Sequence, residues 1–249
     1  HYRMLREIGR GGMGVVWLAH DDVLDRSVAI KMLTRLPGGQ ETQRLIDGTR
    51  AAAAVRSPGL VTVHHVDVFG SVPYLVMELI EGPSLGDLLH TGGPLPLHAA
   101  LWAFLSVCES VSALHDEGVI HRDIKPSNVL VDRDRGPLLT DFGLAVTSGS
   151  LEAGRESEWN VGVAGTPAYM APECFEGFAS SRSDTYALGA MLFELLAGKP
   201  PFAGQPEQAR EAHRAQEPPI HVLQEASVPD PICHAIGRAT QKHARLRPR

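Results

Sequence analysis

The spacing of apolar residues changes near residue 80, and this change constrains the fold more than any other feature of the sequence. Before that point apolar and polar residues alternate and glycines interrupt the pattern, which predicts strands of an antiparallel sheet. The expected strands cover residues 2–9, 14–20, 26–33, 61–69 and 72–78. Beyond residue 80, apolar residues recur mainly at helical spacing.

Helices are predicted at residues 41–55, 96–117 and 183–198. The first should stop before Pro58, and the second at Gly118, where a glycine suits the end of a helix. Ser84 is a suitable N-cap for a further short helix. We also expect short strands at 129–131 and 138–140 and a polar loop over 144–163.

These patterns predict an α+β chain with two lobes. Residues 1–80 would form a small lobe of antiparallel sheet with one main helix, and residues 81–249 a larger, mainly helical lobe. With 43% hydrophobic and 21% charged residues, the chain can bury a core and is not a disordered segment.

Charge and cysteine content exclude several classes of protein. A net charge of −6 gives no footprint for nucleic acid or for an anionic membrane. The three cysteines are far apart and form no CxxC pair, which favours a reducing compartment over a disulfide framework or zinc cluster.

A membrane span is not expected in this segment. The apolar window at 186–197 contains Glu194 and is shorter than the ~20 residues that a span needs. We expect a cytoplasmic domain cut from a longer protein, without membrane contact of its own. A membrane anchor elsewhere in that protein stays open.

A glycine-rich loop lies between the first two expected strands. Residues 9–16 read GRGGMGVV, and the glycines are Gly9, Gly11, Gly12 and Gly14. Glycines let the backbone fold over a polyphosphate and present amide N–H groups to it. Because 25 of the 249 residues are glycine, the match alone is weak. The strand after the loop argues against a dinucleotide-binding loop, which leads into a helix.

Two further features point to phosphate chemistry. Lys31 lies on the third expected strand, where a buried ammonium group needs a partner such as a phosphate; a surface lysine is the alternative. A polar loop at 121–128 combines six residue types at fixed spacing, which chance rarely produces. They are His121, Arg122, Asp123, Lys125, Pro126 and Asn128.

Together with the Asp-Phe-Gly run at 141–143, this loop resembles the catalytic core of the eukaryotic-type (Hanks-type) serine/threonine protein kinases, especially their bacterial branch. The resemblance covers nearly all of residues 2–248 and implies a bilobal protein kinase-like fold. It also implies an enzyme that transfers the γ-phosphoryl group of ATP to protein Ser/Thr hydroxyls, with Mg²⁺ or, as an alternative, Mn²⁺.

The resemblance assigns roles to individual residues. Asp123 would accept the substrate hydroxyl proton, and Lys125 would steady the γ-phosphate. Asn128 and Asp141 would hold the metal ion, and Lys31 would meet the phosphates. The implied ATP-binding residues are Ile8, Gly9, Gly11, Gly12, Gly14, Val16, Ala29, Lys31, Met77, Glu78, Ile80, Asn128, Leu130 and Asp141.

Within that set, Ile8, Val16, Ala29 and Leu130 would enclose the adenine between apolar side chains. Met77 would be the gatekeeper, and the backbone at Glu78 and Ile80 would bond the base edge.

Other implied roles are structural. Glu173 in the Ala-Pro-Glu run should pair with Arg247, and Asp184 should anchor the backbone of the 121–128 loop. Thr166 should bond Asp123 and Lys125. His121 and Phe142 should be neighbours in a packed column of side chains.

The helix expected at 41–55 departs from the family pattern. Counting back from Pro58, the glutamate that pairs with the strand lysine falls on Gly48. Asp47 points about 100° away around the helix, and Glu41 lies about 10 Å along the axis. Neither is a clean replacement, although a one-residue error in the alignment would promote Asp47. Without the pairing, we expect Lys31 to be less well preorganised and activity to be reduced.

The activation loop also departs from the pattern. Two threonines of bacterial relatives are replaced by Glu158 and Asn160, with Ser157 as a nearby phosphate acceptor. One hypothesis is that Glu158 supplies a permanent charge to Arg122; an unpaired, solvated glutamate is the alternative.

Three functions are compatible with parts of the sequence. An active Ser/Thr kinase is favoured because the base, metal ligands, lysine and glycine loop are all present. The alternative is a weakly active or inactive pseudokinase that serves as an interaction module, which only Gly48 favours. A small-molecule phosphotransferase is disfavoured by the peptide-docking runs at 165–166 and 171–173. Expected partners are protein substrates and a second copy during autophosphorylation; nucleic acid is not expected.

Overall fold

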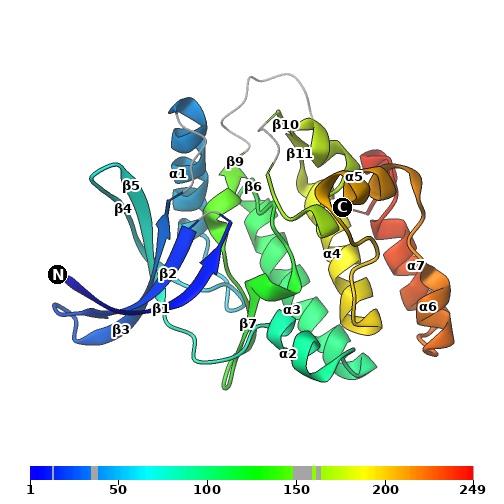
Figure 1. The fold of residues 1–249 in the computed structure, drawn as a ribbon, viewed down its shortest axis with the longest axis horizontal. Coiled ribbons are helices and arrows are strands. Elements are labelled where there is room, and N and C mark those ends of the chain that lie inside the picture. The colour runs from blue at the N-terminus through cyan, green and yellow to red at the C-terminus, as the bar shows by residue number, and fades with distance from the viewer. Residues whose placement is uncertain (13, 35–38, 148–158, 161–163, 249) are drawn as a thin grey trace.

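The computed structural model describes residues 1–12, 14–34, 39–147, 159–160 and 164–248. Side chains are not described for some residues at the start of the first helix and for 143, 159 and 160. Figure 1 shows a sheet and one helix at one side of the molecule and the remaining long helices at the other. This arrangement confirms the expected α+β, bilobal fold.

One five-stranded antiparallel sheet dominates the first part of the chain. In the order β1-β2-β3-β5-β4, it consists of β1 (Tyr2–Gly11), β2 (Gly14–Asp21), β3 (Arg26–Leu33), β4 (Val63–Phe69) and β5 (Val72–Glu78). On β3, Val28, Ile30 and Ala29 are all buried, so the central strand is covered on both faces. Burial on β3 therefore does not follow the alternation of a strand that is exposed on one face.

One helix, α1 (Gly39–Ala54), accompanies the sheet and ends before Pro58, as predicted. It also contacts the short strands β6 (Val119–Ile120) and β9 (Val146–Thr147) of the other part of the molecule, beside which it lies in Figure 1. The helix therefore links the sheet to the segment after Asp-Phe-Gly.

The second part of the chain is mainly helical. Its helices are α2 (Leu85–Gly92), α3 (Leu97–Asp116), α4 (Ser181–Ala197), α5 (Pro206–Ala215), α6 (Ile220–Glu225) and α7 (Asp230–Ala239). The short strands β7 (Val129–Asp132) and β8 (Gly136–Leu139) pair antiparallel, and β10 (Trp159–Asn160) pairs with β11 (Phe178–Ala179).

Local signals explain where the helices begin and end. Ser84 caps α2: its hydroxyl accepts from the Asp87 amide at 3.0 Å, and the Asp87 carboxylate accepts from the Ser84 amide at 2.9 Å. After α3, Gly118 adopts a left-handed φ of 68°, which glycine tolerates.

The expected loop at 144–163 is partly wrong, because β9 and β10 lie within it. Each has only two residues, too few to give an alternating pattern.

Among the described residues, α3 alone is long and apolar enough to cross a membrane, by length and composition only. Its Val107, Val111 and Leu114 are buried in the main core, and the helix packs against α4. One such helix is weak evidence for a span, since core helices meet the same criteria.

Candidate active site

The loop at 121–128 is fixed from beneath by a buried aspartate of α4. Asp184 is 1% exposed, and its carboxylate accepts from the backbone N–H of His121 and of Arg122, both at 2.9 Å. His115 Nε2 lies 2.8 Å from the same carboxylate. These bonds hold Arg122 at a φ of 72°, in a left-handed region that few non-glycine residues adopt. The predicted anchoring role of Asp184 is confirmed.

The charge of Asp184 is maintained despite its burial. Burial alone would raise the pKa of this carboxyl, but the hydrogen bond and charge of His115 outweigh it and the pKa lies below its usual value. A buried, ionised Asp184 is therefore part of the folded site.

Asp123 lies at the centre of a network of polar side chains. Its carboxylate accepts from Lys125 Nζ at 2.7 Å, from Thr166 Oγ1 at 2.7 Å and from Asn128 Nδ2 at 2.9 Å. Lys125 Nζ also donates to Thr166 Oγ1 at 2.6 Å, which confirms the predicted contacts of Thr166. Because these partners come from two segments, they fix the carboxylate in one orientation.

Lys31 forms an ion pair with Asp141, 110 positions further along the chain. The lysine is 7% exposed, so the alternative of a surface lysine is wrong. Burial alone would raise the pKa of Asp141, but the charge of Lys31 and its hydrogen bond hold the pKa below its ordinary value. The partner that a buried ammonium requires is thus a carboxylate of the protein itself.

A cleft of about 860 Å³ separates the sheet from the helical part. The predicted ATP-binding residues that line it are Ile8, Gly9, Val16, Ala29, Lys31, Met77, Glu78, Ile80, Asn128, Leu130 and Asp141. The Glu78 side chain is paired with Arg135 at 2.7 Å, and its backbone N–H donates to the Thr62 carbonyl at 3.0 Å, so the predicted bond from this backbone to the base edge stays a prediction. The structure thus brings together the apolar and the polar groups expected around a nucleotide.

The other predicted glycines, Gly11, Gly12 and Gly14, are not among the residues that line this cleft. Gly14 has a separate structural reason, since a Cβ there would lie 1.9 Å from the Met32 carbonyl oxygen. Their contact with ATP stays a prediction.

The cleft also contains residues that sequence reasoning missed, including Leu18, Val61 and Thr140. Leu18 stands two positions after Val16 on β2, and this period-2 spacing could have indicated it.

Asn128 and Asp141 have the chemistry of a magnesium site. Both line the cleft, and Asn128 Nδ2 donates to the backbone and side-chain oxygens of Asp123 at 2.7 and 2.9 Å. These bonds turn the amide oxygen of Asn128 away from Asp123. Within the described residues, no cluster of three or more His, Cys, Asp or Glu is suited to a metal. Two oxygen ligands fit Mg²⁺, which usually keeps waters and phosphates as its remaining ligands.

The packing around this site agrees with the implied column of side chains. His121 and Phe142 are fully buried, and their rings meet edge to face with centroids 5.7 Å apart. This predicted contact is confirmed.

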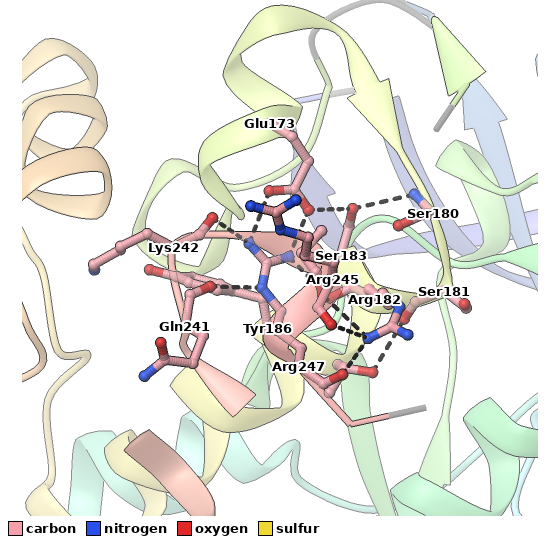
Figure 2. Close-up of polar contacts among 12 residues, drawn as sticks. Glu173, Ser180, Ser181, Arg182, Ser183, Tyr186, Gln241, Lys242, Arg245 and Arg247 are labelled. Carbon is pink, nitrogen blue, oxygen red and sulfur yellow. Dashed lines mark hydrogen bonds and ion pairs between the residues drawn. The ribbon is translucent and has the colours of Figure 1, made fainter. Parts of the chain in front are cut away.

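Figure 2 shows the buried pair that closes the segment below the site. Arg247 donates to Glu173 Oε1 at 2.5 Å and to Oε2 at 2.8 Å, and the arginine side chain is fully buried. Its guanidinium also lies 4.8 Å from the Tyr186 ring centroid. The predicted pairing is confirmed, with the two-pronged geometry that suits arginine.

The position assigned to the helix glutamate is buried in α1 and carries no side chain. Gly48 faces the backbone of Ala145, and Asp47 beside it is exposed, bonded to Gln43 at 2.9 Å and 3.6 Å from Arg50. The alternative of Asp47 as the partner of Lys31 is therefore wrong. The side chain of Glu41 lies outside the described residues.

The activation-loop hypotheses are left untested. Ser157 and Glu158 lie outside the described residues, and Asn160 is placed only through its backbone pairing with Phe178. The proposed charge at Glu158 stays a prediction.

The sequence resembles known protein kinases over nearly its whole length. The family described as protein kinase domain matches residues 2–240. Serine/threonine-protein kinase PrkC of Bacillus subtilis is 35% identical over 246 residues, which cover 97% of this chain and 37% of the relative. Serine/threonine-protein kinase PknB of Mycobacterium tuberculosis H37Rv is 34% identical over 227 residues, which cover 88% of this chain and 36% of the relative.

Serine/threonine-protein kinase PkaA of Streptomyces coelicolor is 34% identical, over 99% of this chain and 47% of the relative. The chain thus spans less than half the length of these relatives. None of the comparisons supports the pseudokinase alternative.

Proposed function

The chain belongs to the protein kinase family, and we propose that it transfers the γ-phosphoryl group of ATP to Ser and Thr hydroxyls of proteins. The observation that carries this proposal is the network around Asp123, which reaches the cleft through Asn128, together with the Lys31–Asp141 pair that lines the same cleft. Asp123 supplies a proton acceptor, and Lys31, Asp141 and Asn128 supply groups for phosphates and metal.

In the proposed reaction, the oxygen of the substrate hydroxyl bonds to the γ-phosphorus, and Asp123 accepts the proton of that hydroxyl. The bond from that phosphorus to the β,γ-bridging oxygen breaks, and ADP leaves. Lys125 Nζ donates to Asp123 at 2.7 Å, and its positive charge would offset the negative charge of the transferring phosphoryl group. Thr166 accepts from Lys125 and donates to Asp123, which keeps base and cation in register.

Beside Asp123, Asn128 and Asp141 are the cleft residues that would hold Mg²⁺, or Mn²⁺ in its place. When bound, the metal offsets phosphate charge and orients the triphosphate. Lys31 adds a positive charge near Asp141, and the apolar residues Val16, Ala29 and Leu130 would hold the adenine by burial.

The setting of the reaction is also a proposal. A cytoplasmic location is supported by the free cysteines of the described chain, Cys108, Cys174 and Cys233. Burial raises the pKa of Cys108 and of Cys174 to about 12, so these thiols are unreactive. Protein substrates follow from the family, and self-association would allow autophosphorylation. Nucleic acid and membrane are not proposed as partners of this segment.

The test is transfer of labelled phosphate from γ-³²P-ATP with Mg²⁺ to the chain itself and to a basic model protein. We expect Asp123→Asn to lower the rate at least 10³-fold, since the base and its fixed orientation are lost. Asp134→Asn, an exposed aspartate in the turn between β7 and β8, is the matched control and should keep the wild-type rate. Equal incorporation by wild type and Asp123→Asn would refute the assignment of the base.

A further inference from the structure

Helix α1 approaches the start of the activation segment more closely than a side chain at its contact point would allow. A Cβ built on Gly48 would lie 1.9 Å from the carbonyl oxygen of Ala145, 2.5 Å from its carbonyl carbon and 2.8 Å from Cα of Val146. All three atoms belong to backbone, which cannot rotate away as a long side chain does. Only glycine therefore allows this approach at residue 48.

The next residue adds a directed bond to the same segment. Thr49 is 1% exposed, and its hydroxyl donates to the carbonyl oxygen of Phe142 at 3.0 Å. Phe142 is itself held from the other side, against the ring of His121. Although neighbouring helical positions differ by about 100°, Gly48 and Thr49 both contact the segment at residues 142–146, Gly48 at Ala145 and Val146 and Thr49 at Phe142.

Residues 142–146 begin directly after Asp141, the partner of Lys31. Asp141 has a φ of 73°, a left-handed value that its surroundings must maintain. Fixing the carbonyl of Phe142 and the backbone of Ala145 limits how far Asp141 can turn. The position of the helix is thereby transmitted to the carboxylate that pairs with Lys31.

We propose that Gly48 and Thr49 are positioning residues that hold Asp141 toward Lys31 by docking α1 on residues 142–146. Close packing and one hydroxyl bond do here what an ion pair between the helix and the strand lysine would otherwise do. The inference rests on the proposed phosphotransfer for its meaning, but its geometry concerns the metal-holding residue and is testable by binding.

This inference reverses an expectation from the sequence. A missing glutamate at residue 48 suggests that Gly48→Glu would improve preorganisation of Lys31. In the structure, any side chain at this position meets the backbone of Ala145 and must push α1 and residues 142–146 apart. Gly48→Ala and Gly48→Glu should therefore both weaken Mg²⁺-dependent binding of ADP at least 5-fold and lower the transfer rate at least 10-fold.

The matched control is another helical glycine that has room for a side chain. Gly237 lies in α7, and a Cβ there would meet nothing within 4 Å. Gly237→Ala should leave both the ADP affinity and the transfer rate at the wild-type value.

The decisive pair of variants is at Thr49, where the fold is less at risk. Thr49→Val keeps the shape and removes the donor, whereas Thr49→Ser keeps the donor. We expect Thr49→Val to raise the Mg²⁺ concentration for half-maximal ADP binding at least 3-fold, and Thr49→Ser to restore it. If Thr49 only stabilised the fold, Thr49→Val would lower the melting temperature and leave that Mg²⁺ concentration unchanged.

Calorimetric titration with ADP at several Mg²⁺ concentrations measures the ADP affinity of every variant, and it requires no phosphate transfer. Wild-type affinity in Gly48→Glu, or equal Mg²⁺ dependence in Thr49→Val and wild type, would overturn the inference. If Gly48 variants do not fold, the Thr49 pair decides. If the wild-type chain binds Mg-ADP but transfers no phosphate, the proposed function is refuted. The binding measurements would then still decide whether Gly48 and Thr49 position Asp141.

Discussion

Single carboxylates set the electrostatics of the site, and each is held in a different way. Asp123 is surrounded by three side-chain donors, Asp141 by Lys31, and Asp184 by two backbone amides and His115. Asp141 and Asp184 both have pKa values below the ordinary range because these partners outweigh burial. The negative charges of Asp141 and Asp184 are thus present before any ligand binds.

Asp184 should make the fold sensitive to acid. Its pKa in the folded chain is below the usual 3.8 for aspartate, so its contribution is fully present above that value. This stabilising contribution is lost as the pH falls through the pKa of Asp184 in the folded chain, because a protonated carboxyl no longer accepts all of its buried hydrogen bonds. Denaturant unfolding between pH 7 and pH 3 should show the free energy of unfolding falling below about pH 4.

The variant Asp184→Asn should remove part of this dependence. At pH 7 it should destabilise the chain by about 3 kcal/mol, since an amide cannot accept from all three donors and leaves buried N–H groups unsatisfied. Asp134→Asn, which is exposed, should change the free energy of unfolding by less than about 0.5 kcal/mol. An acid-sensitive stability that is the same in Asp184→Asn and wild type would contradict the assigned role.

A buried ion pair holds the segment around Arg247 against the helical part of the molecule. Arg247 bonds Glu173 and also the carbonyls of Gln241 at 2.7 Å, and of Arg182 and Lys242 at 3.0 Å. Figure 2 shows these partners converging on one guanidinium. The arginine thus links α4, the Ala-Pro-Glu run and the end of the chain.

Arg247→Lys should be costly for this reason. An ammonium group has three donors and no planar fork, so it cannot serve Glu173 in two-pronged fashion and also reach these carbonyls. We expect a loss of about 3 kcal/mol in the free energy of unfolding, measured with urea. Arg245→Lys, an exposed neighbour, should lose less than about 0.5 kcal/mol. Equal midpoints for the two variants would contradict this view of the pair.

Most elements and the main site loop could be predicted because their signals are local. The strands of the sheet show period-2 alternation, and residues 121–128 carry their residue types in one short run. The two-residue strands β9 and β10 were missed because so short a run has no period. The Lys31–Asp141 pair and the contact of Gly48 with Ala145 were also missed, because they join segments far apart in the chain. The anomaly at Gly48 was visible in the sequence, but its physical reason was not.

The sheet part and the helical part of the molecule meet along several independent contacts. The backbone of Val61 donates to the Leu139 carbonyl at 2.9 Å, and Leu139 donates to the Gly59 carbonyl at 2.8 Å. Leu138 of β8 is buried within the apolar cluster of the sheet. With α1 docked on residues 142–146, these contacts set the width of the cleft in which Lys31 faces Asp141. Figure 1 shows this meeting of sheet, α1 and helical part.

We propose that this protein transfers phosphate to Ser and Thr hydroxyls with Asp123 as the base. The most direct measurement is phosphoamino-acid analysis of the labelled products after reaction with γ-³²P-ATP and Mg²⁺. We predict label on phosphoserine, phosphothreonine or both, none on phosphotyrosine, and labelling at least 10³-fold slower with Asp123→Asn. Label on phosphotyrosine, or no label from a folded wild-type chain that binds Mg-ADP, would contradict the account.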